Sequence, residues 1–188
     1  NTLEEQTVEY KGQVKLLKAT TGLAINEAAV LEGIKDISAA TKLTLGGSAE
    51  ALATAVFKAK ALGVEMKDLE AISSSLLNFQ SSIEDELSAE LLTGKQLNLE
   101  RARAAALADD QATLADELAK NIGTAADFQA MNVIQQGALA KAVGLTRDTL
   151  AQSLMKREAM AALSQFEGET ETQKYQNAVK QLGVDGAR

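Results

Sequence analysis

The stretch that decides the fold is Met66–Thr93, "MKDLEAISSSLLNFQSSIEDELSAELLT". Its apolar residues recur at intervals of three and four, the spacing that places side chains on one face of an α-helix. They are Leu69, Ile72, Leu76, Phe79, Ile83, Leu87 and Leu91. The spacing predicts one amphipathic helix over residues 66–93, about 40 Å long at 1.5 Å per residue. Its apolar stripe must be buried against a partner.

The rest of the chain has the same helical character. Ala, Leu, Glu, Lys and Gln dominate, and these residues lose little free energy on entering a helix, whereas β-branched runs are scarce. We therefore predict an all-α fold, a multi-helix bundle or helical-hairpin array of about eight helices. The Ala-rich segment "LERARAAAL" is expected to lie between neighbouring helices, because small side chains allow close approach.

Glycine marks the predicted helix ends, because the chain contains no proline and glycine favours the left-handed C-terminal cap. Three divisions are expected: N-terminal helices over 1–47, a main helical domain over 48–167, and a loosely attached C-terminal helix over 168–188. The predicted helices cover 3–20, 26–45, 48–63, 66–93, a segment from 98, a segment from 110 to 123, 124–143 and 147–166, with a short helix through Tyr175, Val179 and Leu182.

A phrase recurs along the chain: "KATTGLAINEA", "KALGVEMKDLEAI", "KAVGLTRDTLAQSL" and "KQLGVD", with its glycine at positions 22, 63, 144 and 183. The spacings are close to one or two units of forty residues, a period found in helical arrays. The alternative is that the phrase solves one local problem, ending a helix and starting the next. We favour this alternative, since the copy expected near residue 104 lacks the glycine.

The composition excludes several kinds of active site. The chain has 188 residues and contains no His, Cys or Trp. It therefore cannot form a Ser-His-Asp or Cys-His arrangement, a zinc site of nitrogen and sulfur ligands, or a disulfide framework. Any metal would need oxygen ligands only, and no catalytic, cofactor-binding or metal-binding residue is predicted. We expect the chain not to be an enzyme, and no cofactor is expected.

Charge and hydropathy restrict the partners. The net charge is -7 and no basic cluster stands apart from the acids, so specific nucleic-acid binding is not expected. The longest uncharged runs, such as Ala71–Ile83 and Phe128–Ala140, are too short and too polar to span a bilayer. We therefore expect a soluble chain. It begins with Asn1 instead of Met, which suggests a fragment of a longer protein.

The dipeptide Gly94-Lys95 is the strongest suggestion of a phosphate-binding loop. A Walker loop needs a glycine at position 89, a hydroxyl residue at 96 and a preceding strand. The chain has Ala89, Gln96 and a predicted helix instead. Gly94 is therefore interpreted as a helix C-cap, with Lys95 near the carbonyl end of that helix.

Other charged residues also have structural interpretations. Adjacent acids point to different sides of a helix, so Glu84, Asp85 and Glu86 are interpreted as a solvated face. Asp109 and Asp110 are interpreted as a helix start. Arg101 and Arg103 are expected to pair with neighbouring acids. The four phenylalanines, Phe57, Phe79, Phe128 and Phe166, are predicted to lie in the core.

Two long phrases resemble the tail tape-measure proteins of phages. They are "LLNFQSSIEDELSAELLTGKQLNLERARAAALADDQATLADELAKNIGTAADF" and "MNVIQQGALAKAVGLTRDTLAQSLMKREAM". The resemblance runs from about Leu62 to Leu163 and is one of wording, without a catalytic signature; the flanks agree in character only. It implies a virion protein, made in the host cytoplasm, that fills the tail-tube lumen, sets tube length, assists tail assembly and leaves ahead of the DNA during genome ejection.

The implied partners are the tail-tube protein, tail-tip or baseplate hub proteins, tail assembly chaperones and further copies of the chain in a homo-oligomer, with DNA adjacent but not specifically bound. Two other classes of protein stay open. One is a helical protein-binding adaptor of a bacterial secretion or toxin system, whose exposed stripe recruits a partner. The other is a helical enzyme that uses carboxylates alone.

Overall fold

The computed structural model describes residues 3–164, and these form eleven α-helices without a strand. The helices are α1 (Leu3–Thr21), α2 (Glu27–Lys35), α3 (Ala39–Thr44), α4 (Ala49–Leu62), α5 (Met66–Leu77), α6 (Phe79–Thr93), α7 (Glu100–Leu107), α8 (Gln111–Ile122), α9 (Ala125–Ala130), α10 (Val133–Ala142) and α11 (Arg147–Ser164). The prediction of an all-α chain is confirmed for this part. Two predictions lie outside the described residues. They are the core position of Phe166 and the short helix through Tyr175, Val179 and Leu182.

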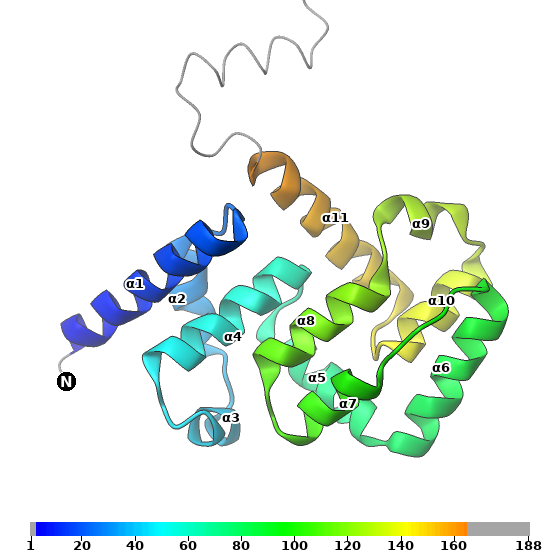
Figure 1. Cartoon of the computed structure of the whole chain (residues 1–188), viewed down its shortest axis with the longest axis horizontal. Helices are drawn as coiled ribbons and strands as arrows, with labels where there is room; N and C mark the ends of the chain where they lie inside the picture. Colours follow the sequence, from blue (N-terminus) through cyan, green and yellow to red (C-terminus); the bar gives the residue numbers. More distant parts are fainter. Residues whose placement is uncertain (1–2, 165–188) are drawn as a thin grey trace, which may run out of the picture.

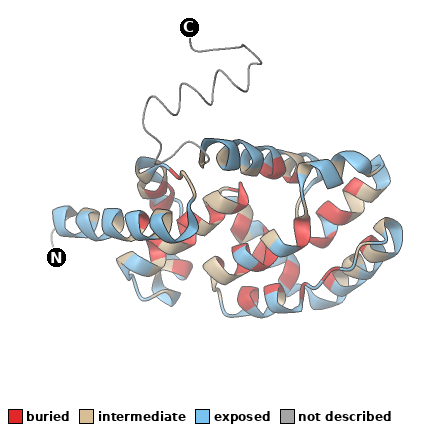
Figure 2. Cartoon of the chain, turned by 45° about the horizontal axis from the view of Figure 1, so that its top comes forward, coloured by how far each residue is buried: buried red, intermediate tan, exposed pale blue. Residues whose placement is uncertain are grey.

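Helix α4 lies between α1 and α8 (Figure 1). It contacts α1, α2, α8 and α11, while α6 packs on α10 at the opposite end from α1. Helices α5, α7 and α8 fill the space between these ends. In Figure 2 the buried residues gather along the middle helices, whereas α1, which starts at the N label, is exposed along most of its length.

One apolar cluster joins these elements. It runs from Val14 in α1 through Phe57 in α4 and Leu118 in α8 to Leu154 in α11. Gly33 in α2 allows the closest approach to α4, because a Cβ there would lie 2.6 Å from Cγ1 of Val56. The apolar cluster therefore includes residues on both sides of position 47. The division of the chain at this position stays a prediction.

The helix predicted over residues 66–93 is wrong as a single element. It divides at Asn78, whose backbone (φ -79°, ψ 80°) leaves the helical region and whose side chain accepts a hydrogen bond from the Ser81 amide at 3.4 Å. Asn78 thus satisfies an amide that a new helix leaves free. Leu69, Ile72 and Leu76 of α5 are buried, while the rest of the stripe lies on α6.

Two further predicted helices also divide at polar caps. The helix expected from Asn26 breaks before Ser38, whose hydroxyl accepts from the Thr41 amide at 3.2 Å. The helix expected over 124–143 breaks at Asn132, whose side chain accepts from the Gln135 amide at 2.8 Å. The prediction had no break at these three caps, so the about eight helices expected become eleven.

The recurring phrase has a tertiary role at two of its positions. Gly63 and Gly144 both have positive φ, at 86° and 79°, and both end a helix. A Cβ on Gly63 would overlap the carbonyl oxygen of Ser153, and a Cβ on Gly144 would lie 3.2 Å from Cα of Ile72. Ile72 lies nine positions after Gly63, and Ser153 lies nine positions after Gly144. Each glycine thus contacts the equivalent position of the other hairpin, so the hairpins α4–α5 and α10–α11 pack reciprocally.

Candidate interaction surface

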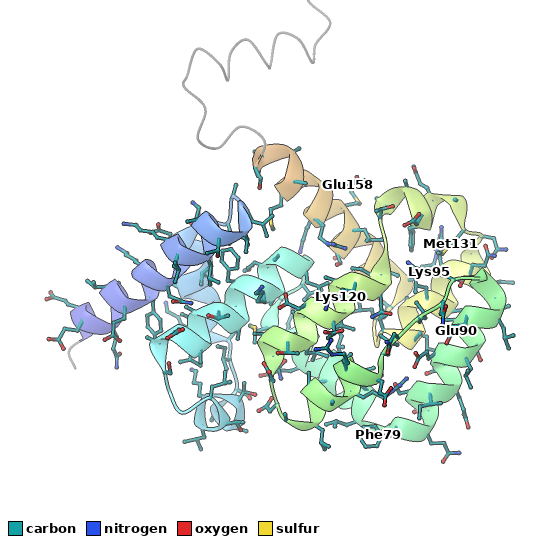
Figure 3. The ribbon with its side chains drawn as sticks, in the orientation of Figure 1. Phe79, Glu90, Lys95, Lys120, Met131 and Glu158 are labelled. Carbon is teal, nitrogen blue, oxygen red and sulfur yellow. The ribbon has the colours of Figure 1, made fainter. Side chains whose placement is uncertain are left out.

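The outer side of α6 carries an uncovered apolar stripe. Phe79, Ile83, Leu87 and Leu91 recur every four residues, and their exposed fraction rises from 43% at Phe79 to 86% at Leu91. Figure 3 labels Phe79 at the start of this helix and Glu90 near its end. The prediction that the whole stripe is buried holds for α5 and fails for α6. Phe79 is consequently not a core residue, whereas Phe57 is fully buried as predicted.

The opposite side of α6 is fixed to the body of the protein. Ser82 and Ala89 are buried on this side, against the neighbouring helices. Lys141 of α10 forms an ion pair with Asp85 at 3.4 Å, and Gln135 Nε2 donates to the carbonyl oxygen of Leu92 at 2.9 Å. These contacts fix the rotation of α6 about its axis, and that rotation turns the apolar stripe outward.

A nearly buried ion pair joins α6 to α7. The guanidinium of Arg103 pairs with the carboxylate of Glu86, and their side chains are only 11% and 12% exposed. Arg103 Nε also donates to the Ser82 hydroxyl at 2.9 Å, and Glu86 accepts the Leu99 amide at 3.1 Å. Glu86 is therefore not part of a solvated face, which corrects the sequence interpretation, and Arg103 pairs with an acid as expected.

A hollow of about 500 Å³ lies between α6 and α7. Apolar and polar side chains both line it, and the nearly buried Arg103–Glu86 pair is among them. The lining residues are Phe79, Ile83, Glu86, Asn98, Glu100, Arg103, Ala104 and Leu107. Leu107 is itself exposed, 28 positions after Phe79 in the chain. The two helices thus form a groove that is continuous with the stripe on α6, because Phe79 and Ile83 belong to both.

The surroundings of this groove are acidic. Glu84 and Glu90 lie on α6 and Glu100 opens α7, whereas Asp85 and Glu86 are neutralised by Lys141 and Arg103. Within residues 3–164, no ion pair involves Glu84, Glu90 or Glu100; Glu84 accepts only a hydrogen bond from Gln80 Nε2, at 3.4 Å. An uncovered apolar groove with a negative rim is therefore the most distinctive surface of the described chain.

Gly94-Lys95 is a helix end, as the sequence predicts. Gly94 has φ 70° and its amide donates to the Glu90 carbonyl at 2.9 Å, closing α6. The Lys95 amide donates to the Thr93 hydroxyl at 3.1 Å. The Lys95 side chain leaves this helix end and reaches Gly123, where a Cβ would lie 2.6 Å from the lysine Nζ. The dipeptide begins the connection from α6 to α7.

Lys95 also contributes to the electrostatics of Asp127. The Thr124 amide donates to the Asp127 carboxylate at 2.9 Å, in a capping box that the sequence predicts. This hydrogen bond lowers the pKa of Asp127, with smaller contributions from the Thr124 hydroxyl and the charge of Lys95. Asp127 therefore stabilises the start of α9 in its ionised form.

The remaining charged candidates have structural partners. Arg101 pairs with Glu117 at 3.6 Å, as expected. Asp110 accepts from the Thr113 amide at 3.1 Å and caps α8, also as expected. Asp109 instead adopts a positive φ of 54° and accepts hydrogen bonds from Thr41 and Gln111. Asp109 thus ties α3 to the start of α8.

A second hollow, of about 430 Å³, lies among α4, α8 and α11. Its wall is mainly apolar, and Arg157 contributes a guanidinium that donates to the Gly123 carbonyl at 3.2 Å. Burial lowers the pKa of Arg157 below its ordinary value. Lys58 at the edge is paired with Asp116 at 3.1 Å, so the charges here serve mainly to join helices.

Residues 3–164 contain neither a membrane-spanning helix nor a metal-binding cluster. None of the described helices combines the length and the apolar character that crossing a membrane requires. No cluster of three or more Asp or Glu side chains in this part could hold a metal ion. Comparison with known proteins finds no matching family model, no matching curated protein and no matching solved structure.

Proposed function

We propose that this chain is a structural segment of a phage tail tape measure, which acts through helical surfaces during tail assembly and sets the length of the tail tube. The observation that carries the proposal is the apolar stripe of α6, which the rest of the described chain leaves uncovered. Contiguous exposed apolar surface of this kind marks a site of protein association. A role in assembly gives the stripe a partner.

The resemblance of the sequence to tape-measure proteins supports the same proposal. The first of the two phrases that resemble tape-measure proteins runs from α5 to α9, and the second covers α10 and most of α11. The first of them contains the stripe, the groove and the Arg103–Glu86 pair. A chain without proline and cysteine can also be unravelled during genome ejection without breaking disulfides. In this role the partners are tail-tube subunits, tail-tip or hub proteins, chaperones and further copies.

Mass spectrometry of purified virions tests this proposal. Tryptic peptides of the segment, such as Ala142–Arg147, should be present in intact tails and depleted from tails that have ejected their DNA. Peptides of a tube subunit, measured in the same samples, provide the control because the tube stays in place. Absence of the segment from intact virions would overturn the proposal.

The second candidate is a helical adaptor that recruits one protein partner. The groove between α6 and α7 favours it, because exposed apolar side chains beside charged groups suit a single bound helix. The two candidates differ in where the chain is found. An adaptor would co-purify with its partner in cells that make no tails, whereas a tape measure would accumulate in tail particles.

A further inference from the structure

We infer that the groove between α6 and α7 binds an amphipathic helix whose apolar face is flanked by lysine or arginine. The first ground is shape. The stripe from Phe79 to Leu91 advances by one apolar residue every four positions over about 18 Å of helix. A partner helix of three turns with apolar side chains at the same spacing would cover it.

The second ground is depth. The hollow beside the stripe is bounded by Phe79 and Ile83 of α6 and by Ala104 and Leu107 of α7. The small side chain of Ala104 leaves room between the larger ones, so the groove accepts a large apolar side chain from a partner. The Arg103–Glu86 pair keeps the two walls together without help from the partner.

The third ground is charge, and it selects the partner. Glu84, Glu90 and Glu100 surround the apolar surface, and no basic side chain of residues 3–164 forms an ion pair with them. A second copy docked through the same face would bring these carboxylates against its own, which is unfavourable. A helix with basic flanks places ammonium or guanidinium groups beside them. The complementary partner is therefore a basic amphipathic helix of another protein.

This inference names the partner class of the surface used in the proposed function, but its test needs no virion. Two synthetic amphipathic peptides serve as probes, with the same leucine stripe and with either lysines or glutamates on its flanks. Calorimetry with the whole chain should show that the lysine peptide binds at least about tenfold more tightly, with an affinity that falls as salt rises. Equal binding of both peptides, or binding of neither, would overturn the inference.

Matched variants locate the binding. Leu87→Glu, or Glu84→Lys combined with Glu90→Lys, should weaken the lysine peptide about tenfold or more. Leu43→Glu in α3 and Glu4→Lys combined with Glu9→Lys in α1 make the same changes on exposed residues elsewhere, and should leave the affinity unchanged. An equal loss in both sets would mean attraction to net charge only, and would refute a specific groove.

Sedimentation of the chain alone tests whether a second copy of the chain, instead of a basic helix, binds in the groove. The chain should not self-associate through α6, so Leu87→Glu should leave its sedimentation coefficient unchanged. A dimer that Leu87→Glu dissociates would overturn the inference in favour of a homotypic interface. Circular dichroism of each variant verifies that the helices are retained. Failure of peptide binding would leave the tail-particle test of the proposed function unaffected, so the two failures are separable.

Discussion

Gly63 and Ser153 are in direct backbone contact, and the contact is repeated between Gly144 and Ile72. The Ser153 hydroxyl also donates to the Leu62 carbonyl at 2.6 Å, in a buried position at the end of α4. A residue larger than glycine would separate α4 from α11. This reciprocal contact joins the first half of the described chain to its last helix, because α4 and α5 form one hairpin and α11 belongs to the other.

Gly63→Ala is expected to destabilise the protein by about 2 kcal/mol or more, since it combines a left-handed backbone with a clash against Ser153. Gly12→Ala is the control. Gly12 lies inside α1 with no atom near its missing Cβ, so alanine should stabilise by about 0.5–1 kcal/mol. Urea denaturation measures both. Changes of the same sign would contradict the reciprocal packing.

The division of the stripe at Asn78 makes its two halves respond differently to truncation. Leu76→Ala removes a fully buried side chain and should cost about 2–5 kcal/mol. Leu87→Ala removes an exposed one and should change the free energy of unfolding by less than about 0.5 kcal/mol. Thermal and urea unfolding of the two variants measure this difference. Equal losses would mean that α6 is covered in solution.

Removing only one partner of the Arg103–Glu86 pair is expected to lower the free energy of unfolding. Arg103→Met leaves the Glu86 carboxylate nearly buried without its cation, and should destabilise by about 3 kcal/mol. Adding Glu86→Gln removes that charge while keeping an acceptor for the Leu99 amide, so the double variant should recover part of the loss. A double variant as unstable as the sum of both singles would argue against coupling.

Asp127 provides a pH-dependent contribution to stability. Its folded pKa is lowered by the Thr124 amide, so its contribution is present above the unfolded pKa and is lost as pH falls through the lower folded pKa. Carboxyl NMR titration should show Asp127 titrating below an ordinary aspartate. Because the Thr124 hydroxyl also lowers the pKa of Asp127, Thr124→Val should move that pKa upward. An unshifted Asp127 in the parent chain would refute the capping box.

Sequence patterns predict the breaks at glycines well, but they miss the breaks at Ser38, Asn78 and Asn132. Gly63, Gly94 and Gly144 each have a positive φ that glycine adopts without strain. These helix ends can therefore be predicted from the local sequence alone. Asn and Ser occur both inside and outside helices. Whether Asn78 and Ser38 cap a new helix is therefore decided only by the direction of the helix that follows. The continuous 3.6-residue period across Asn78 therefore concealed a break.

The groove could not be predicted because it depends on tertiary distance. Phe79 and Leu107 line it from two helices, and periodicity places each residue on a face without showing which helix covers that face. The burial of Glu86 has the same origin, since it follows from the position of Arg103 on α7. The Gly63–Ser153 contact has a sequence signal, namely the equal spacing of Ile72 and Ser153 from their glycines.

Tail length in phage particles tests the role as a structural ruler most directly. An in-frame deletion of residues 3–164 from the parent gene should give tails shorter by up to about 240 Å, at 1.5 Å for each residue that lies as helix along the tube. Leu87→Glu, which removes no length, should reduce the number of tails and leave the length of those that form unchanged. Electron microscopy that shows tails of normal length after the deletion would contradict the proposed role.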